Sequence, residues 1–226
     1  MKYPIFTFIF TILIALEIFL PARVPEINLL TKGALVASIM TWYIINVSRQ
    51  NKTYIIALIF ALTGDLLLAF GTNEAFLLGM GAFAVMQILY IAIFMKGYAK
   101  PTGWKLYLSI ALLLIYLVFI LGFGSKLKEL YVPVALYGAL LTTMAITAVN
   151  IRSRSISPIT IGALFFLLSD VLLGIHKFIT PLPMEHFLVI TSYSIAQYLI
   201  AYGLIESFRI ANERALANAK PMKKKK

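Results

Sequence analysis

The chain has 226 residues, of which 61% are hydrophobic and 13% are charged, and its formal net charge is +11. A soluble domain of this length does not need so much apolar surface. The sequence contains no cysteine, which excludes disulfides, iron–sulfur clusters and thiol catalysis. Its two histidines are too few for a dedicated zinc site, which usually takes three or four ligands. We therefore expect neither a metal nor another cofactor.

Uncharged stretches of membrane length fill most of the chain. A spanning helix needs about 20 mainly apolar residues, and four stretches of this kind contain no Asp, Glu, Lys or Arg: 75–95, 106–125, 130–151 and 186–205. Four shorter or singly interrupted runs follow the same pattern: 4–20, 33–47, 53–70 and 158–175. The sequence predicts an all-α polytopic membrane protein with eight transmembrane helices, forming one transmembrane domain over residues 1–226.

The basic residues are divided unevenly between the two sides that eight spans imply. One side carries the N-terminus, the second, fourth and sixth connections and the C-terminal tail, and it holds 15 Lys and Arg against five on the other side. This asymmetry follows the positive-inside rule, so a membrane explains the net charge and no nucleic-acid partner is expected. We expect both termini in the cytoplasm, location in the cell (inner) membrane, and a basic cytoplasmic tail over residues 211–226. Its last lysines either lie near anionic head groups or are simply solvated.

Two aspartates lie within apolar spans in similar local sequences. Asp65 and Asp170 each follow a small residue, with Phe five positions before and Leu-Leu two and three positions after. A carboxylate at bilayer depth costs about 2.5–3.5 kcal/mol on insertion scales, so such groups usually face inward. Burial and a second nearby carboxylate both disfavour ionisation, so one aspartate can stay protonated beside an ionised partner and the two can act as acid and base. The alternative is a structural pair that only bonds neighbouring helices.

A second pair of similar segments indicates an internal duplication. Gln87 and Gln197 each follow an aromatic residue four positions earlier, Phe83 and Tyr193 respectively, and precede a Leu two positions later. With the aspartate segments, they predict two parallel four-helix repeats, 1–110 and 111–210, related by an axis along the membrane normal. Chance matching in a sequence rich in Phe and Leu is the alternative.

The other polar residues inside the spans give a set of candidate site residues around the carboxylates. No nucleophile elbow, phosphate-binding loop or metalloprotease motif is present in the sequence. We expect Asp65 and Asp170 to be catalytic and to line one enclosed polar cavity. Packing between helices is the alternative for the amides and hydroxyls, and snorkelling to the interface is the alternative for Lys32. The candidates for substrate binding are Lys32, Tyr137, Tyr90, Gln87, Tyr193, Gln197 and Ser169.

Two further segments are expected to lie outside the chemistry. Glu17, near the end of the first span, is expected to reach the membrane interface. The span over 106–125, nearly all Leu, Ile, Val and Tyr, is expected to be a lipid-facing scaffold.

Taken together, these residues resemble the YhhN-like lysoplasmalogenase family, whose members are eight-helix membrane proteins of about this length. The resemblance covers nearly the whole chain. It departs from the family pattern at Gly33, where Pro is common, and at Gln87, where His is common; a His could relay protons and Gln cannot. The residues that carry the resemblance are Thr31, Lys32, Gly64, Asp65, Leu67, Leu68, Gly79, Phe83, Tyr90, Tyr137, Phe166, Ser169, Asp170, Lys177, Phe178, Tyr193, Ala196 and Gln197.

The resemblance implies a hydrolase that cleaves the vinyl-ether bond of lysoplasmalogens to a fatty aldehyde and glycerophosphocholine or glycerophosphoethanolamine. That reaction needs an acid, a nearby negative charge and a water, which suits a pair of carboxylates. Its partners would be a lysophospholipid substrate and the bilayer. Two other functions stay open. One is a proton-coupled transporter of a small amphipathic solute or lipid, and the other is a non-catalytic assembly or lipid-binding protein.

Overall fold

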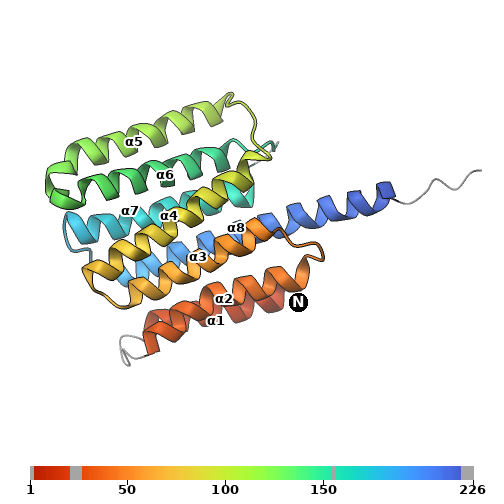
Figure 1. Cartoon of the computed structure of the whole chain (residues 1–226), viewed down its shortest axis with the longest axis horizontal. Coiled ribbons are helices and arrows are strands. Elements are labelled where there is room, and N and C mark those ends of the chain that lie inside the picture. Colours follow the sequence, from red (N-terminus) through yellow and green to blue (C-terminus); the bar gives the residue numbers. More distant parts are fainter. Residues whose placement is uncertain (1–2, 21–26, 154–155, 220–226) are drawn as a thin grey trace, which may run out of the picture.

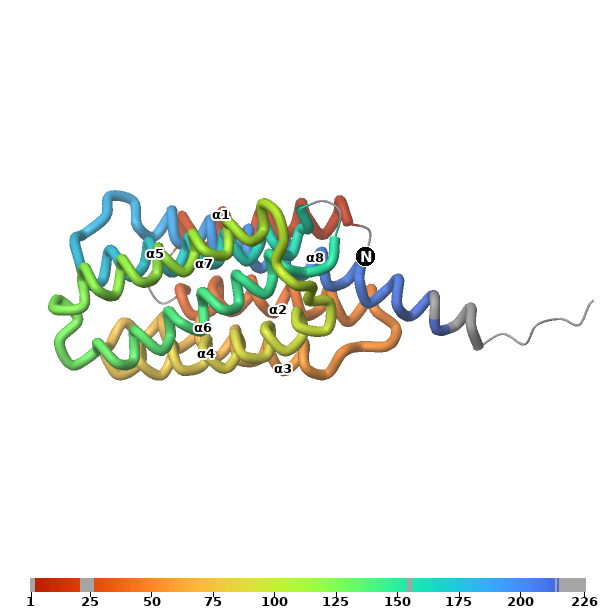
Figure 2. Tube along the Cα trace, turned by 90° about the horizontal axis from the view of Figure 1, so that it is seen from above, coloured from red at the N-terminus to blue at the C-terminus, as the bar shows by residue number. Residues whose placement is uncertain are grey.

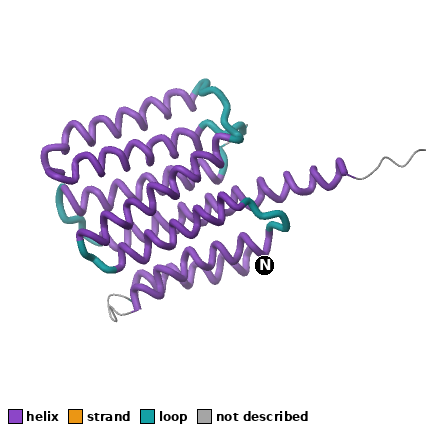
Figure 3. Tube along the Cα trace, in the orientation of Figure 1, coloured by secondary structure: helices purple, strands orange, loops and turns teal. Residues whose placement is uncertain are grey.

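The computed structural model describes residues 3–20, 27–153 and 156–219. Within these ranges the chain is helical and forms no strand (Figure 3), so the predicted all-α class is confirmed. A 3-10 turn, η2 (Lys128–Leu130), separates the fifth helix from the sixth. The α-helices are α1 (Tyr3–Phe19), α2 (Asn28–Asn46), α3 (Lys52–Ala69), α4 (Asn73–Met95), α5 (Trp104–Leu127), α6 (Tyr131–Val149), α7 (Pro158–Phe178) and α8 (Glu185–Ala219).

Among the described residues, six helical segments are long and apolar enough to cross a membrane, and the protein is therefore a multi-pass membrane protein. These segments are α2, α3, α4, α7, the first 29 residues of α8, and a continuous 46-residue apolar stretch that includes both α5 and α6. Helix α1 is equally apolar but has only 17 residues. Length and apolarity alone thus identify fewer separate spans than the sequence predicted.

Two helix boundaries differ from the predicted spans. Helix α2 begins at Asn28, so Lys32 lies about one turn inside the helix. Helix α8 continues to Ala219, because residues after the apolar segment are strong helix formers and Arg209 pairs with Glu206 and Glu213 along the helix. The final lysines at 223–226 lie outside the described residues.

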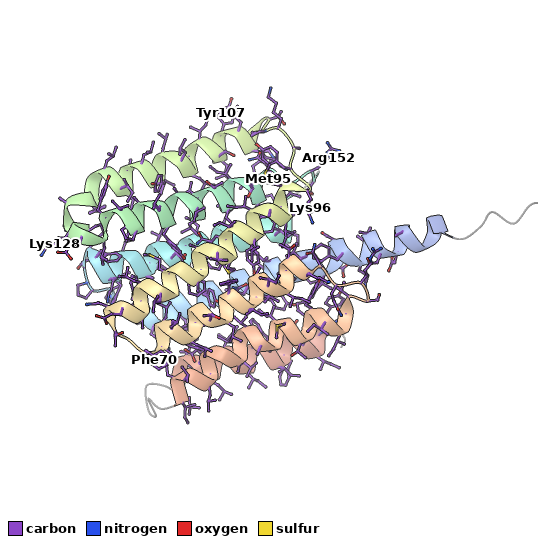
Figure 4. The ribbon with its side chains drawn as sticks, in the orientation of Figure 1. Phe70, Met95, Lys96, Tyr107, Lys128 and Arg152 are labelled. Carbon is purple, nitrogen blue, oxygen red and sulfur yellow. The ribbon has the colours of Figure 1, made fainter. Side chains whose placement is uncertain are left out.

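The helices form two layers with roughly aligned axes, α1, α8, α7 and α5 in one and α2, α3, α4 and α6 in the other (Figure 2). Helix α3 packs most closely on α4, and α7 on α8. The described ends of the chain lie at the same end of the bundle, where α8 projects beyond the other helices (Figure 1). Lys96 and Arg152 lie at that end, and Lys128 and Phe70 at the opposite end (Figure 4).

Small residues allow the close packing of the helices that carry the aspartates. A Cβ atom on Gly162 of α7 would lie 2.8 Å from the Ala196 carbonyl oxygen of α8, and one on Gly64 of α3 would lie 2.7 Å from the Phe83 ring of α4. Such positions bring helix backbones together in membranes. Gly64, the small residue before Asp65, is thus a packing residue. It lets α3, and with it the Asp65 carboxylate, lie close to α4.

Candidate functional site

One cavity of about 380 Å³ lies among helices α2 to α8, and Gly71 and Thr72 of the α3–α4 connection are among the residues that line it. Its walls are mainly apolar, with side chains from α4, α5 and α6 such as Met80, Phe119 and Val134. Within the described ranges, no three His, Asp or Glu side chains converge as metal ligands. The mainly apolar walls therefore suit an apolar molecule that meets a few polar groups.

The structure brings six of the nine predicted site residues to this cavity. They are Lys32, Asp65, Tyr137, Ser169, Asp170 and Tyr193. The other three, Gln87, Tyr90 and Gln197, are fully buried and do not line the cavity. Spacing along a helix predicted that all nine lie inside the bundle, but it could not separate the cavity wall from the layer behind it.

Asp170 lies on α7 and faces α6 across the cavity. Its Oδ2 atom accepts a hydrogen bond of 2.5 Å from the Tyr137 hydroxyl. The Gln87 amide lies near that hydroxyl but makes no hydrogen bond of good geometry. Asp170 is half-buried, so one carboxyl face stays accessible to a molecule in the cavity.

Asp65 lies on α3 and is more deeply buried than Asp170, with 7% of its surface exposed. Its Oδ2 atom accepts a hydrogen bond of 2.8 Å from the Tyr193 hydroxyl of α8. The Tyr193 oxygen in turn accepts from the Gln197 amide nitrogen at 3.1 Å, and the Gln197 oxygen accepts from the Tyr90 hydroxyl at 3.0 Å. A continuous chain of hydrogen bonds therefore leads from Asp65 into the core.

Ser169, the small residue before the second aspartate, connects two helices. Its hydroxyl donates to the Val189 carbonyl oxygen of α8 at 3.1 Å. This bond fixes α7 against α8 immediately beside Asp170. It corresponds to the packing alternative for a hydroxyl inside a membrane helix.

Basic side chains gather where the α7–α8 connection meets the cavity, and sequence reasoning did not include most of them. His176, Lys177 and His186 line the cavity together with Lys32. Lys177 also donates to Asn73 Oδ1 at 3.2 Å and lies 5.1 Å from the centre of the Phe76 ring, which ties the end of α7 to the start of α4. In the sequence, these residues could have been noticed only because they lie at the ends of predicted spans. Those span ends become adjacent only in the folded bundle.

Glu17 does not reach the interface as expected. Its side chain is fully buried because α1 packs against both α2 and α8. The His186 Nε2 atom lies 3.0 Å from the Glu17 carbonyl oxygen and 4.0 Å from its carboxylate. A third carboxylate therefore lies behind the basic end of the cavity.

The expectation for α5 was also only partly right. One face of α5 is strongly exposed, as at Leu121 and Val118. The other face supplies Leu112, Phe119 and Ile120 to the cavity wall. A span composed of Leu, Ile and Val shows no periodicity that would reveal such an inner face.

Comparison with known proteins places these features in a family. The sequence model of the YhhN family matches residues 27–204, a range that contains both aspartates and excludes α1. The chain is 28% identical over 157 residues to a human protein named lysoplasmalogenase TMEM86A, covering 67% of this chain and 65% of that protein. It is 32% identical over 151 residues to human lysoplasmalogenase TMEM86B, covering 67% and 62%.

A bacterial protein gives a similar match. The chain is 28% identical over 162 residues to the lysoplasmalogenase of Mycobacterium bovis, covering 70% of this chain and 62% of that protein. The chain thus spans a little under two thirds of the length of these relatives. No solved structure matches it.

Proposed function

Because the chain belongs to the YhhN family, we propose that it is a membrane hydrolase that cleaves the vinyl-ether bond of lysoplasmalogens. The observation that carries the proposal is the placement of Asp65 and Asp170 on the wall of a single, mainly apolar cavity. A purely structural pair would not need a cavity among helices α2 to α8. The names of the relatives supply the substrate class.

The cavity suits the two ends of a lysoplasmalogen. The apolar walls from α4, α5 and α6 provide a surface for the alkenyl chain. Lys32 and Lys177, which line the cavity, provide charge for the phosphate of the head group. Both carboxylates line this cavity, so the vinyl-ether bond at the junction of chain and glycerol would meet them.

Two carboxylates supply what the hydrolysis needs. The protonated carboxyl donates its proton to the outer alkene carbon, and the ionised carboxylate stabilises the resulting oxocarbenium ion. Water adds to that cation and loses a proton to the carboxylate that donated in the first step, which restores the acid for the next turnover. The hemiacetal then breaks its carbon–oxygen bond to glycerol, giving a fatty aldehyde and the glycerophospho-alcohol. One water is consumed, and the proton taken up in the first step is returned.

In the proposed membrane arrangement, the chain makes eight spans in two parallel four-helix repeats. Both termini are cytoplasmic, and the protein lies in the cell (inner) membrane. The described ends of α5 and α6 support two separate spans there, since the Lys128 turn reverses the chain. Helix contacts support the repeats, because α2 packs on α8 as α6 packs on α4. Lys96 and Arg152 lie together at one end of the bundle (Figure 4). Basic residues at that end support its placement on the cytoplasmic side.

The direct test is aldehyde release by the purified protein in lipid nanodiscs. A lysoplasmalogen should release aldehyde, and an ester-linked lysophospholipid with the same chain and head group should release nothing. Release of fatty acid from the ester analogue at a similar rate would instead indicate a general lysophospholipase. Substrate movement across sealed vesicles without aldehyde would indicate a transporter.

A further inference from the structure

We infer that Asp65 is the ionised member of the pair and Asp170 is its proton donor, with Tyr193, Gln197 and Tyr90 as positioning residues for Asp65. The inference rests on the proposed function and deepens it, since it assigns different roles to the two carboxylates and moves three residues from substrate binding to the support of one of them. It follows from the direction of the hydrogen bonds and from access to the cavity.

Every hydrogen in the chain that reaches Asp65 is directed toward that carboxylate. The Gln197 amide nitrogen supplies the hydrogen for its bond to the Tyr193 oxygen, so the hydrogen of Tyr193 is free to point to Asp65 Oδ2. The Tyr90 hydroxyl donates to the Gln197 oxygen and polarises the amide in the same sense. Consecutive hydrogen bonds of this kind strengthen one another, so the chain makes the Tyr193 hydroxyl a stronger donor, and a donor to a carboxylate favours its charged form.

The chain has little freedom to rearrange. Tyr90 is fully buried and Gln197 is 1% exposed, and the Tyr193 ring packs edge-on against both the Phe83 and the Phe166 ring. The surroundings of Asp65 are therefore built before a substrate arrives.

Asp170 has a simpler environment that suits a proton donor. Its recorded side-chain hydrogen bond comes from Tyr137. Under the internal duplication, the counterpart of Tyr193 is Phe83, which has no hydroxyl to donate. Asp170 is also the more accessible carboxylate, as a group that must touch the alkene carbon requires.

Other ionisable groups face the two carboxylates and belong in any account of pH dependence. Asp65 faces Lys32 from α2, Glu17 from α1, Tyr193 from α8 and Asp170 from α7. Asp170 faces Tyr137 from α6. The remaining titratable groups on the cavity wall are Tyr116, His176, Lys177, Glu185 and His186.

The two roles predict that two Tyr→Phe variants move different limbs of the pH profile of kcat/KM, each to higher pH. Tyr193→Phe removes a donor from the group that must be ionised, so activity should fail at a higher pH on the acid side. Tyr137→Phe removes a donor from the group that must be protonated, so activity should persist to a higher pH on the alkaline side. Each limb should move by roughly 1–2 pH units, the size of one hydrogen bond to a charged group.

Tyr116→Phe is the matched control, because its hydroxyl donates to the Ala135 carbonyl oxygen while its ring lines the same cavity. It should move neither limb. Movement of the alkaline limb by Tyr193→Phe, or of the acid limb by Tyr137→Phe, would overturn the assignment while leaving the hydrolase intact.

An infrared measurement tests the same assignment without turnover. At neutral pH the carbonyl band of protonated carboxyl groups should keep its wild-type intensity in Asp65→Asn and lose intensity in Asp170→Asn, with any contribution of the buried Glu17 common to all three proteins. Loss of that band in Asp65→Asn instead would reverse the roles. Absence of aldehyde release with this band pattern intact would overturn the proposed function alone.

Discussion

Lys32 lies about one turn inside α2, on the wall of a cavity that is otherwise mainly apolar. If it binds the head-group phosphate, the contact is the same in the bound substrate and in the transition state. Lys32→Ala should therefore raise KM roughly 10–100-fold, the effect of losing one hydrogen bond to a charged group, and leave kcat nearly unchanged. Steady-state kinetics on a lysoplasmalogen measure both quantities.

Lys52→Ala is the control for that variant, because Lys52 is exposed at the start of α3 and does not line the cavity. It should change neither constant. A fall in kcat with unchanged KM in Lys32→Ala would contradict phosphate binding and would instead place Lys32 in the stabilisation of Asp65.

At the residue scale the sequence predicted which side chains surround the carboxylates, Tyr137 and Tyr193 included, but not which of them bonds to which aspartate. A charged residue inside an apolar span must face protein or water, and this constraint identified Asp65 and Asp170. Tyr193 and Gln197 are four residues apart on one helix, so their contact was also within reach of helical geometry. The bond from Tyr137 to Asp170 depends on how α6 is rotated against α7, and no single helix encodes that rotation.

Helix α5 should control which alkenyl chains fit, because its inner face lines the cavity. Phe119→Ala enlarges the apolar wall, and kcat/KM should shift in favour of longer or bulkier chains by roughly 10-fold or more, as expected for a few methylene groups in an apolar pocket. Competition between lysoplasmalogens of different chain length measures the shift.

Leu121→Ala provides the matched control on the same helix, since Leu121 is 77% exposed on the outer face. It should leave the ranking of chain lengths unchanged. Equal shifts in both variants would mean that α5 acts through the stability of the bundle and does not contact the substrate.

The contact between α7 and α8 should be sensitive to a single methyl group at Gly162. A Cβ atom there would meet the Ala196 carbonyl oxygen at 2.8 Å and the Ile200 backbone nitrogen at 2.9 Å, and neither backbone atom can move aside alone. Gly162→Ala should therefore destabilise the protein by about 1–3 kcal/mol, as for other overpacked positions. Thermal unfolding in detergent measures this change.

Gly122→Ala is the corresponding control, because a Cβ atom on Gly122 would meet nothing within 4 Å. Ala is the better helix former, so this variant should be as stable as the wild type or slightly more so. A Gly162→Ala protein that unfolds at the wild-type temperature would show that α7 and α8 pack less tightly than the structure indicates.

Hydropathy predicted where the helices lie but not how far they run. The uncharged stretches coincide with α4, α5, α6 and α8, because apolar residues are required at bilayer depth. The extension of α8 to Ala219 comes from helix propensity and ion pairs outside the apolar segment. The cavity depends on the fit of side chains from helices α2 to α8, which hydropathy does not record.

For the molecule as a whole, the arrangement of loops can be tested by cysteine labelling, because the natural sequence contains no cysteine. In Lys100→Cys and Lys128→Cys the new thiols lie in exposed connections at opposite ends of α5. A membrane-impermeant maleimide applied outside intact cells should label Lys128→Cys and leave Lys100→Cys unlabelled until the cells are opened. Labelling of both positions from the same side would contradict separate spans for α5 and α6.

The central claim is that Asp65 and Asp170 perform acid–base hydrolysis of a vinyl ether in one cavity. The most direct measurement is aldehyde release from a lysoplasmalogen by purified Asp65→Asn and Asp170→Asn, beside Glu74→Gln as a carboxylate control at the exposed start of α4. Each aspartate variant should keep the wild-type unfolding temperature within a few degrees and lose about 10²–10⁴ in rate, as for other general acid–base groups, while the Glu74 variant keeps full activity. Near-normal aldehyde release by both folded aspartate variants would contradict the claim.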